Sequence, residues 1–171
     1  MPLTLHQALV PGWLQLLNAA HGWIDKAAAS SLPEEEVLSA RLIEDMLPFA
    51  YQVKAMTVHS EGAIEGVRAG VFRPRFGEPT PSSLAELRSL VDGAISFLDG
   101  LAEADLEGLM GGDMRFEIGE KRLDFTAENF LLSFSQPNFF FHATTAYGIL
   151  RMKGVGVGKI DYLGRLRLTP R

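Results

Sequence analysis

Residues 137–151 read Pro-Asn-Phe-Phe-Phe-His-Ala-Thr-Thr-Ala-Tyr-Gly-Ile-Leu-Arg, and this stretch predicts the last long helix of the chain. We expect that helix to run from Asn138 to Lys153 and to end at Gly154, because glycine commonly follows a helix end. Three consecutive phenylalanines cover more than one face of a helix, so some must contact neighbouring helices and others are left for a partner surface. The segment therefore predicts a helix that packs among other helices.

The earlier segments with helical spacing of apolar residues would supply those neighbours. Pro11 lies within the first of them, so that helix either begins at the proline or is kinked there. The helical segments that we expect are a long first helix over 5–29, a short lead-in helix over 31–46, a second long helix over 49–68 and a third over 84–101. Ser82 or Ser83 would cap the third, with Glu86 completing a capping box.

A different pattern precedes the last helix. Residues 114–118 and 121–125 alternate polar and apolar side chains around Gly119-Glu120, which is typical of a short β-hairpin. Thr126 would cap the following helical turns, and Pro137 would interrupt them. The sequence thus predicts an all-α fold, an antiparallel bundle of four main helices with one hairpin before the last.

Composition limits the classes of function. A chain of 171 residues with 47% hydrophobic and 22% charged residues suits one globular domain over 1–171. The net charge of −5 provides no basic face, which argues against nucleic acid or anionic lipid as a partner. No apolar run approaches the ~20 residues that span a bilayer. The chain has no cysteine and its first residues lack a signal-peptide pattern, so we expect a cytoplasmic protein.

Two of the four histidines are candidates for chemistry. His59 and His142 lie on or beside the inward stripes of the second and last long helices. Inward histidines from different helices of a bundle can meet in one pocket, as metal ligands or as a general base. The alternative is that each is a core histidine whose nitrogens are bonded to neighbours. His6 and His21 suit that structural interpretation better.

The remaining candidate residues would surround these histidines. Tyr147 joins His59 and His142 as a catalytic candidate, and the ligand-binding candidates are Gln52, Asn138, Phe139 and Thr145. Such a set would give an apolar pocket a few polar points. The alternative explanation for the aromatic side chains is core and dimer packing.

A complete metal site is not evident from the spacing. A catalytic zinc site takes three protein ligands, and histidines at i and i+4 of one helix share a face. Ala146 follows His142 by four residues, while Ala55 and Ala63 flank His59 at the same distance. A zinc or nickel ion on His59 and His142 would therefore need a third ligand from elsewhere.

Three stretches resemble a known family: 41–53, 137–151 and 158–164. The sequence is similar there to an uncharacterised bacterial and fungal domain family grouped with the DinB/YfiT-like metalloenzymes. The resemblance implies an up-down-down-up four-helix bundle, usually dimeric. It also implies a metal site with one histidine from the second helix and two from the last, in a superfamily that includes thiol transferases and isomerases. His59 and His142 match two of these ligands, and Ala146 stands at the third.

Three hypotheses follow. The first is an enzyme, with or without a metal, that acts on a small, partly apolar molecule between the second and last helices. The second is a non-catalytic small-molecule-binding protein that has lost the metal triad. The third is a purely structural homodimer. The sequence does not decide among them.

Overall fold

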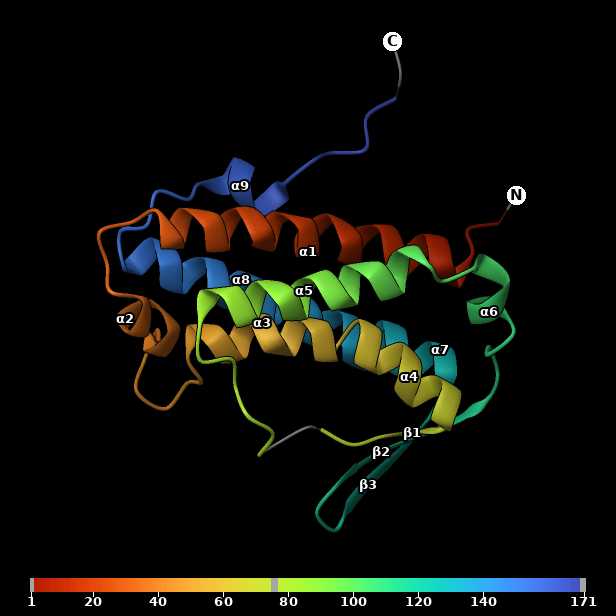
Figure 1. The fold of residues 1–171 in the computed structure, drawn as a ribbon. Helices are drawn as coiled ribbons and strands as arrows, with labels where there is room; N and C mark the ends of the chain where they lie inside the picture. The colour runs from red at the N-terminus through yellow and green to blue at the C-terminus, as the bar shows by residue number, and fades with distance from the viewer. Residues whose placement is uncertain (1, 75–76, 170–171) are drawn as a thin grey trace.

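The computed structural model describes residues 2–74 and 77–169, and within them the fold is mostly helical. The long helices are α1 (Leu5–Ala28), α3 (Phe49–Val58), α4 (Glu61–Ala69), α5 (Leu84–Asp99) and α8 (Gln136–Met152). Helix α1 packs against α5 and α8, and α3 packs against α8 and α5. In Figure 1, α1, α3, α5 and α8 run roughly lengthwise beside one another, α4 follows α3 end to end, and the strands lie beyond α4 at one edge. The prediction of a mostly helical protein is confirmed.

Helix α1 begins earlier than Pro11. Thr4 caps it by accepting a hydrogen bond from the amide of Gln7, and the Gln7 side chain accepts one from the amide of Thr4. Pro11 therefore lies inside the helix, and the alternative in which the helix starts at the proline was wrong. The buried face includes Leu9, Trp13 and Leu17, at the intervals of four expected for an inward stripe.

The predicted second long helix is divided into two. Helix α3 ends at Val58 with His59 as its C-cap, and α4 begins at Glu61. Ser60, between them, has φ −119° and ψ −86°, and its buried hydroxyl donates to the carbonyl of Met56 at 2.8 Å. A serine hydroxyl that bonds a preceding carbonyl competes with the helical backbone ladder. The break places His59 at the C-terminal end of α3 rather than in mid-helix.

The three strands form one small sheet. They are β1 (Val71–Phe72), β2 (Asp113–Ile118) and β3 (Lys121–Thr126), in the order β1-β2-β3. Strand β2 pairs antiparallel with β3, with Ile118 opposite Lys121, and parallel with β1, with Phe116 opposite Phe72. The sequence did not predict β1, so an all-α description with one hairpin leaves out the sheet's third strand. That strand brings Phe72 beside Phe116, at 6.2 Å between ring centroids.

A π-helical segment leads into α8. Thr126 caps the short α7 (Ala127–Asn129) as predicted, and the chain continues through the π-helix η1 (Phe130–Ser135). Pro137 does not interrupt the helix but lies in the first turn of α8, directly after the π-helical turns. Wider turns of this kind often occur near functional sites. Here the segment ends at Ser135, whose hydroxyl contacts His59.

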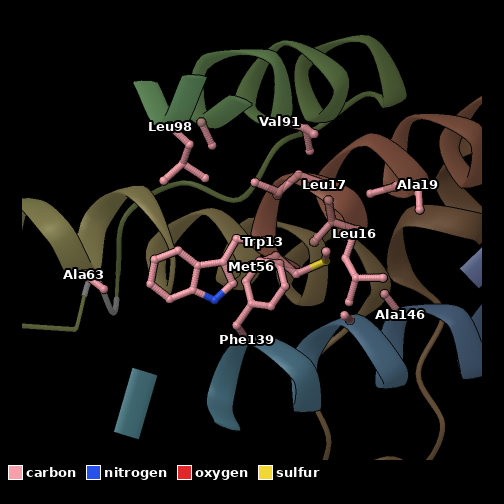
Figure 2. Packing of buried hydrophobic residues seen from close by; sticks show 14 of the residues in the cluster. Trp13, Leu16, Leu17, Ala19, Met56, Ala63, Val91, Leu98, Phe139 and Ala146 are labelled. Carbon is pink, nitrogen blue, oxygen red and sulfur yellow. The ribbon is translucent and has the colours of Figure 1, made fainter. Parts of the chain in front are cut away.

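The apolar core lies between α1, α3, α5 and α8. Figure 2 shows Trp13, Met56 and Phe139 meeting at its centre, from three different helices. All three are fully buried, and the Trp13 and Phe139 rings are 6.1 Å apart.

The shorter helices close the ends and one outer face. They are α2 (Glu34–Ser39), α6 (Glu103–Glu107) and α9 (Lys159–Leu163). Helix α9 lies on the outer side of α1 (Figure 1), where Trp23 donates to the carbonyl of Asp161 at 2.9 Å and Lys26 pairs with its carboxylate at 2.8 Å. Within the described ranges, no helix combines the length and apolarity required for a membrane span.

Candidate functional site

A pocket of about 260 Å³ lies between α3, the start of α8 and the sheet. Helix α3 contributes one face, because residues 51, 54, 55 and 58 recur at helical intervals. The lining residues are Leu47, Tyr51, Lys54, Ala55, Val58, His59, Phe72, Pro74, Phe116, Ile118, Phe134, Asn138 and His142. Most of these side chains are apolar, and a few polar groups are placed among them, which is the usual character of a small-molecule site.

His59 and His142 meet in this pocket. Their rings are stacked, with centroids 5.6 Å apart and planes inclined by 16°. They come from the end of α3 and the second turn of α8, which pack against each other. The structure thus brings together the two histidines that the sequence singled out.

Gln52 orients His142. Its amide nitrogen donates to the carbonyl of Leu47 at 2.8 Å, which leaves Oε1 to face Nδ1 of His142 at 2.7 Å. An amide oxygen only accepts, so Nδ1 must carry the proton and Nε2 must carry the lone pair. Nε2 of His142 has no hydrogen-bond partner among the described residues. It is also not fully buried, so it is exposed at the surface of the pocket. His142 therefore presents a hydrogen-bond acceptor to the pocket.

His59 is held by the π-helical segment. Its Nδ1 lies 3.3 Å from the buried hydroxyl of Ser135, which can donate or accept. Burial, with a smaller contribution from His142, lowers the pKa of His59 to about 3. Burial also lowers the pKa of His142 to about 4. Both imidazoles are therefore neutral at pH 7.

The other polar groups of the pocket are Tyr51, Lys54 and Asn138. Burial raises the pKa of Tyr51, so its hydroxyl keeps its proton at neutral pH. Lys54 is only 6% exposed and donates to the carbonyls of Glu78 and Pro79, each at 3.1 Å. Its ammonium also lies 3.8 Å from the Glu78 carboxylate. Lys54 thus ties the loop before α5 to α3, and its charge already has partners.

Aromatic rings form the wall opposite α3. Phe116 and Phe134 are 4.8 Å apart, and Phe72 lies against Phe116 from β1. His59 contacts this wall through Phe72 at 5.7 Å and Phe134 at 5.8 Å. Aromatic pairs at these separations are favourable beyond the area that they bury. This side of the pocket is therefore an apolar surface of packed rings.

The other predicted site residues have different positions. Asn138 lines the pocket. Gln52 does not line it, but its hydrogen bond orients His142, which does. Thr145 is buried but does not line the pocket, and Phe139 is a core residue against Trp13. Tyr147 packs with Trp23 and Tyr162, at 6.4 Å and 5.5 Å between centroids. Phe139 and Tyr147 project from other faces of α8 than Asn138 and His142, and Thr145 lies one turn farther along the helix.

Sequence reasoning missed Tyr51, Lys54 and the aromatic wall. The spacing of residues 51, 55 and 58 on one helical face was a usable signal for α3. No such signal existed for Phe72 and Phe116, because a sheet pairing joins them across more than 40 positions of the sequence.

The donor set does not fit the metal ion that the family resemblance implies. Among the described residues, no group of three or more histidine, cysteine, aspartate or glutamate side chains could hold a metal. Ala146, where the second histidine of α8 would stand, is fully buried, and Figure 2 shows it beside the core residues. Two neutral imidazoles whose Nδ1 atoms are already bonded leave only two ligand nitrogens, fewer than catalytic zinc takes.

Comparisons with other proteins agree with the fold. Residues 5–163 match the family described as Domain of unknown function (DUF1993). The chain is also similar to the crystal structure of a DinB family member protein from Shewanella denitrificans, with 27% sequence identity and a TM-score of 0.78. That similarity covers 98% of this chain and 96% of the other. No curated protein matches this sequence.

Proposed function

Because the chain belongs to the DUF1993 family and is DinB-like, we propose that it binds a small, largely apolar molecule in the pocket between α3, α8 and the sheet, without a metal ion. One observation carries the proposal. The neutral His59–His142 pair, fixed by Gln52 and Ser135, faces a cavity whose other walls are mainly aromatic and aliphatic.

The free-energy cost of burying the two imidazoles has to be offset by their hydrogen bonds. A buried polar nitrogen without a partner costs about 1–3 kcal/mol, and here each Nδ1 has one. The two Nε2 atoms do not have a protein partner among the described residues. A ligand could form a hydrogen bond with these nitrogens and displace water from the aromatic wall. Both contacts would add to its binding free energy. The cavity is smaller than the usual 300–1,000 Å³, which favours a ligand of one ring or a short chain.

A second candidate is a metal-free enzyme of the thiol transferase or isomerase type that the superfamily resemblance implies. The observation in its favour is the fixed tautomer of His142, since a general base needs an oriented lone pair. A pKa of about 4 makes His142 a weak base at neutral pH, which places binding ahead of catalysis. The test is 2-mercaptoethanol, a small uncharged thiol, with 1-chloro-2,4-dinitrobenzene. The sulfur would attack the ring, chloride would leave and the thiol proton would pass to His142, so His142→Phe should lower the rate to that of the uncatalysed reaction.

Three further parts of the proposal rest on the resemblance. We propose that residues 1–171 form a single DinB-like domain, with the long helices arranged up-down-down-up and β2–β3 as a hairpin before the last of them. We also propose that the protein is cytoplasmic and forms a homodimer. Exposed apolar side chains such as Ile43 and Phe141 are available for such contacts.

The binding proposal is tested with toluene as the probe, by titration of the ¹⁵N-labelled protein and observation of backbone amide shifts. Saturable shifts at Ala55, Val58 and Phe134 are expected. Ala55→Phe, which fills the pocket from α3, should remove them. Ala85→Phe adds the same bulk at an exposed position of α5 and should leave them unchanged. Val58→Trp is a second filling variant at a half-buried position, for use if Ala55→Phe does not fold.

Absence of saturable shifts in the wild type, both with toluene and with its hydroxylated analogue p-cresol, would overturn the proposal. So would equal toluene affinity in the wild type and in a folded filling variant, because the probe would then be bound elsewhere.

A further inference from the structure

We infer that the ligand of this pocket is an uncharged aromatic molecule with a hydroxyl group, such as a phenol, whose O–H donates to Nε2 of His142. The inference rests on the proposed binding function and adds the chemical class of the ligand. Three observations support it: the hydrogen bond between Gln52 and His142, the aromatic wall, and the hydrogen bonds that Lys54 already makes within the protein.

The hydrogen bond between Gln52 and His142 determines which kind of ligand group can bind to His142. Since Nδ1 donates to Gln52, a ligand at Nε2 meets a lone pair and must bring a donor. Rotating the Gln52 amide would break its bond to Leu47, so the alternative tautomer is disfavoured by a second hydrogen bond. Hydroxyl, amine and thiol groups meet this requirement, whereas a carboxylate does not.

The described charges around the pocket disfavour anionic ligands. A carboxylate would bring a second acceptor against Nε2 and would bind only with a protonated His142. Burial opposes that protonation, because a charged imidazole would lose its hydration among the mainly apolar side chains of the lining. Among the described lining residues the cation is Lys54, and it is already bonded to two carbonyls and paired with Glu78. It therefore contributes little free charge for a ligand.

The shape of the pocket selects the rest of the molecule. Phe72, Phe116 and Phe134 form a wall of rings, and Ala55 leaves space on the opposite face where a larger side chain would fill it. A flat ring can stack on that wall, and its hydroxyl at one edge can reach the histidines. An ammonium ligand has the required donor but would lose its hydration among apolar walls. A neutral phenol combines the donor with the flat body.

The experiment compares three probes that share a methyl-substituted benzene ring at pH 7: toluene, p-cresol and 4-methylbenzoate. Dissociation constants come from amide-shift titrations of the wild type. We expect p-cresol to bind about tenfold more tightly than toluene, as one hydrogen bond to a buried acceptor would give. We expect 4-methylbenzoate to bind more weakly than toluene.

Variants connect the preference to His142. In His142→Phe, p-cresol and toluene should bind with similar affinity, because the acceptor is gone and the ring remains. Gln52→Met, which retains the imidazole, should also reduce the preference, because the tautomer is no longer fixed. His21→Phe removes a histidine of α1 that does not line the pocket and should leave the preference intact.

The outcomes separate this inference from the proposed function. If toluene binds in the pocket and p-cresol binds no more tightly, or 4-methylbenzoate binds best, the ligand class is wrong while the binding function stands. If toluene and p-cresol both fail to bind, the binding function itself fails. A preference that persists in folded His142→Phe would also overturn the inference.

Discussion

Oε1 of Gln52 lies 2.7 Å from Nδ1 of His142, so a buried amide on α3 determines the protonation pattern of an imidazole on α8. The amide itself is held by the carbonyl of Leu47. These two hydrogen bonds fix the tautomer and the orientation of the His142 ring. Hydrogen-bond partners behind the histidines of metal sites and acid–base sites orient those rings in the same way. Here it fixes an acceptor in a pocket with too few ligands for a metal.

The first prediction concerns this tautomer. In the wild type at pH 7, the ¹⁵N shifts of the His142 ring should show a protonated Nδ1 and an unprotonated Nε2. Gln52→Met should shift His142 toward the other tautomer and lower the free energy of unfolding by about 1–3 kcal/mol, because Nδ1–H loses its acceptor. Gln136→Met is the control, since Gln136 bonds to Ala8 rather than to a histidine. A wild-type His142 protonated at Nε2 would contradict the prediction.

The second prediction concerns pH and stability. The pKa values of His59 and His142 are about 3 and 4 in the folded protein, against about 6.5 in the unfolded chain. Between pH 6.5 and 4 the unfolded chain therefore binds protons that the folded protein does not, and stability falls as pH falls. We expect a loss of up to about 2 kcal/mol per histidine between pH 7 and pH 5, measured by urea unfolding.

The double variant His59→Phe/His142→Phe is the control for this dependence. Its stability should change much less over the same interval, because most carboxylates titrate below pH 5. Equal pH dependence in the wild type and the double variant would mean that other groups cause the loss.

Several elements of this fold were predictable from the sequence because they depend on local spacing. The apolar stripe that includes Leu9, Trp13 and Leu17 predicted α1, and the caps at Ser83 and Thr126 followed from residue type. Even here the detail differs, because Glu86 bonds to Ser82 while Ser83 bonds to the amide of Glu86. Local hydrogen-bonding preferences determine these features, so a single sequence reveals them.

The site was only partly predictable because it depends on interruptions and long-range pairing. The break at Ser60 and the π-helical turns before Gln136 interrupt the regular helical period, and they set the positions of His59 and Ser135. Phe72 reaches the pocket through a two-residue strand that carries no periodicity. A period can predict which residues face inward, but it cannot distinguish a pocket from a core. Tyr147 and Phe139, inward-facing yet outside the pocket, illustrate this difference.

The third prediction concerns metal. Protein purified without a histidine tag should contain zinc and nickel far below one ion per chain by elemental analysis, because the described residues provide no group of three ligands. Addition of zinc at micromolar concentration should not raise the melting temperature, whereas a tight site would stabilise the folded state. One ion per chain that is lost in both His59→Ala and His142→Ala would overturn the prediction.

The fourth prediction separates packing from surface among the consecutive phenylalanines. Phe139 is fully buried against Trp13 and Met56 (Figure 2), whereas Phe141, two residues later on the same helix, is 54% exposed. Phe139→Ala should lower the free energy of unfolding by about 3–5 kcal/mol, because it removes a buried ring and leaves a cavity. Phe141→Ala is the matched substitution and should change it by less than about 1 kcal/mol in the monomer.

The same pair of variants bears on assembly and on ligand binding. If the chain forms a homodimer through the exposed face of α8, Phe141→Ala should weaken the dimer in sedimentation experiments while the monomer keeps its stability. Toluene affinity should be similar in Phe141→Ala and the wild type, because Phe141 does not line the pocket. A small stability loss in Phe139→Ala together with a large loss of toluene binding would instead assign Phe139 to the ligand. The ring would then have to turn from the core, where it meets Trp13 at 6.1 Å, toward the pocket.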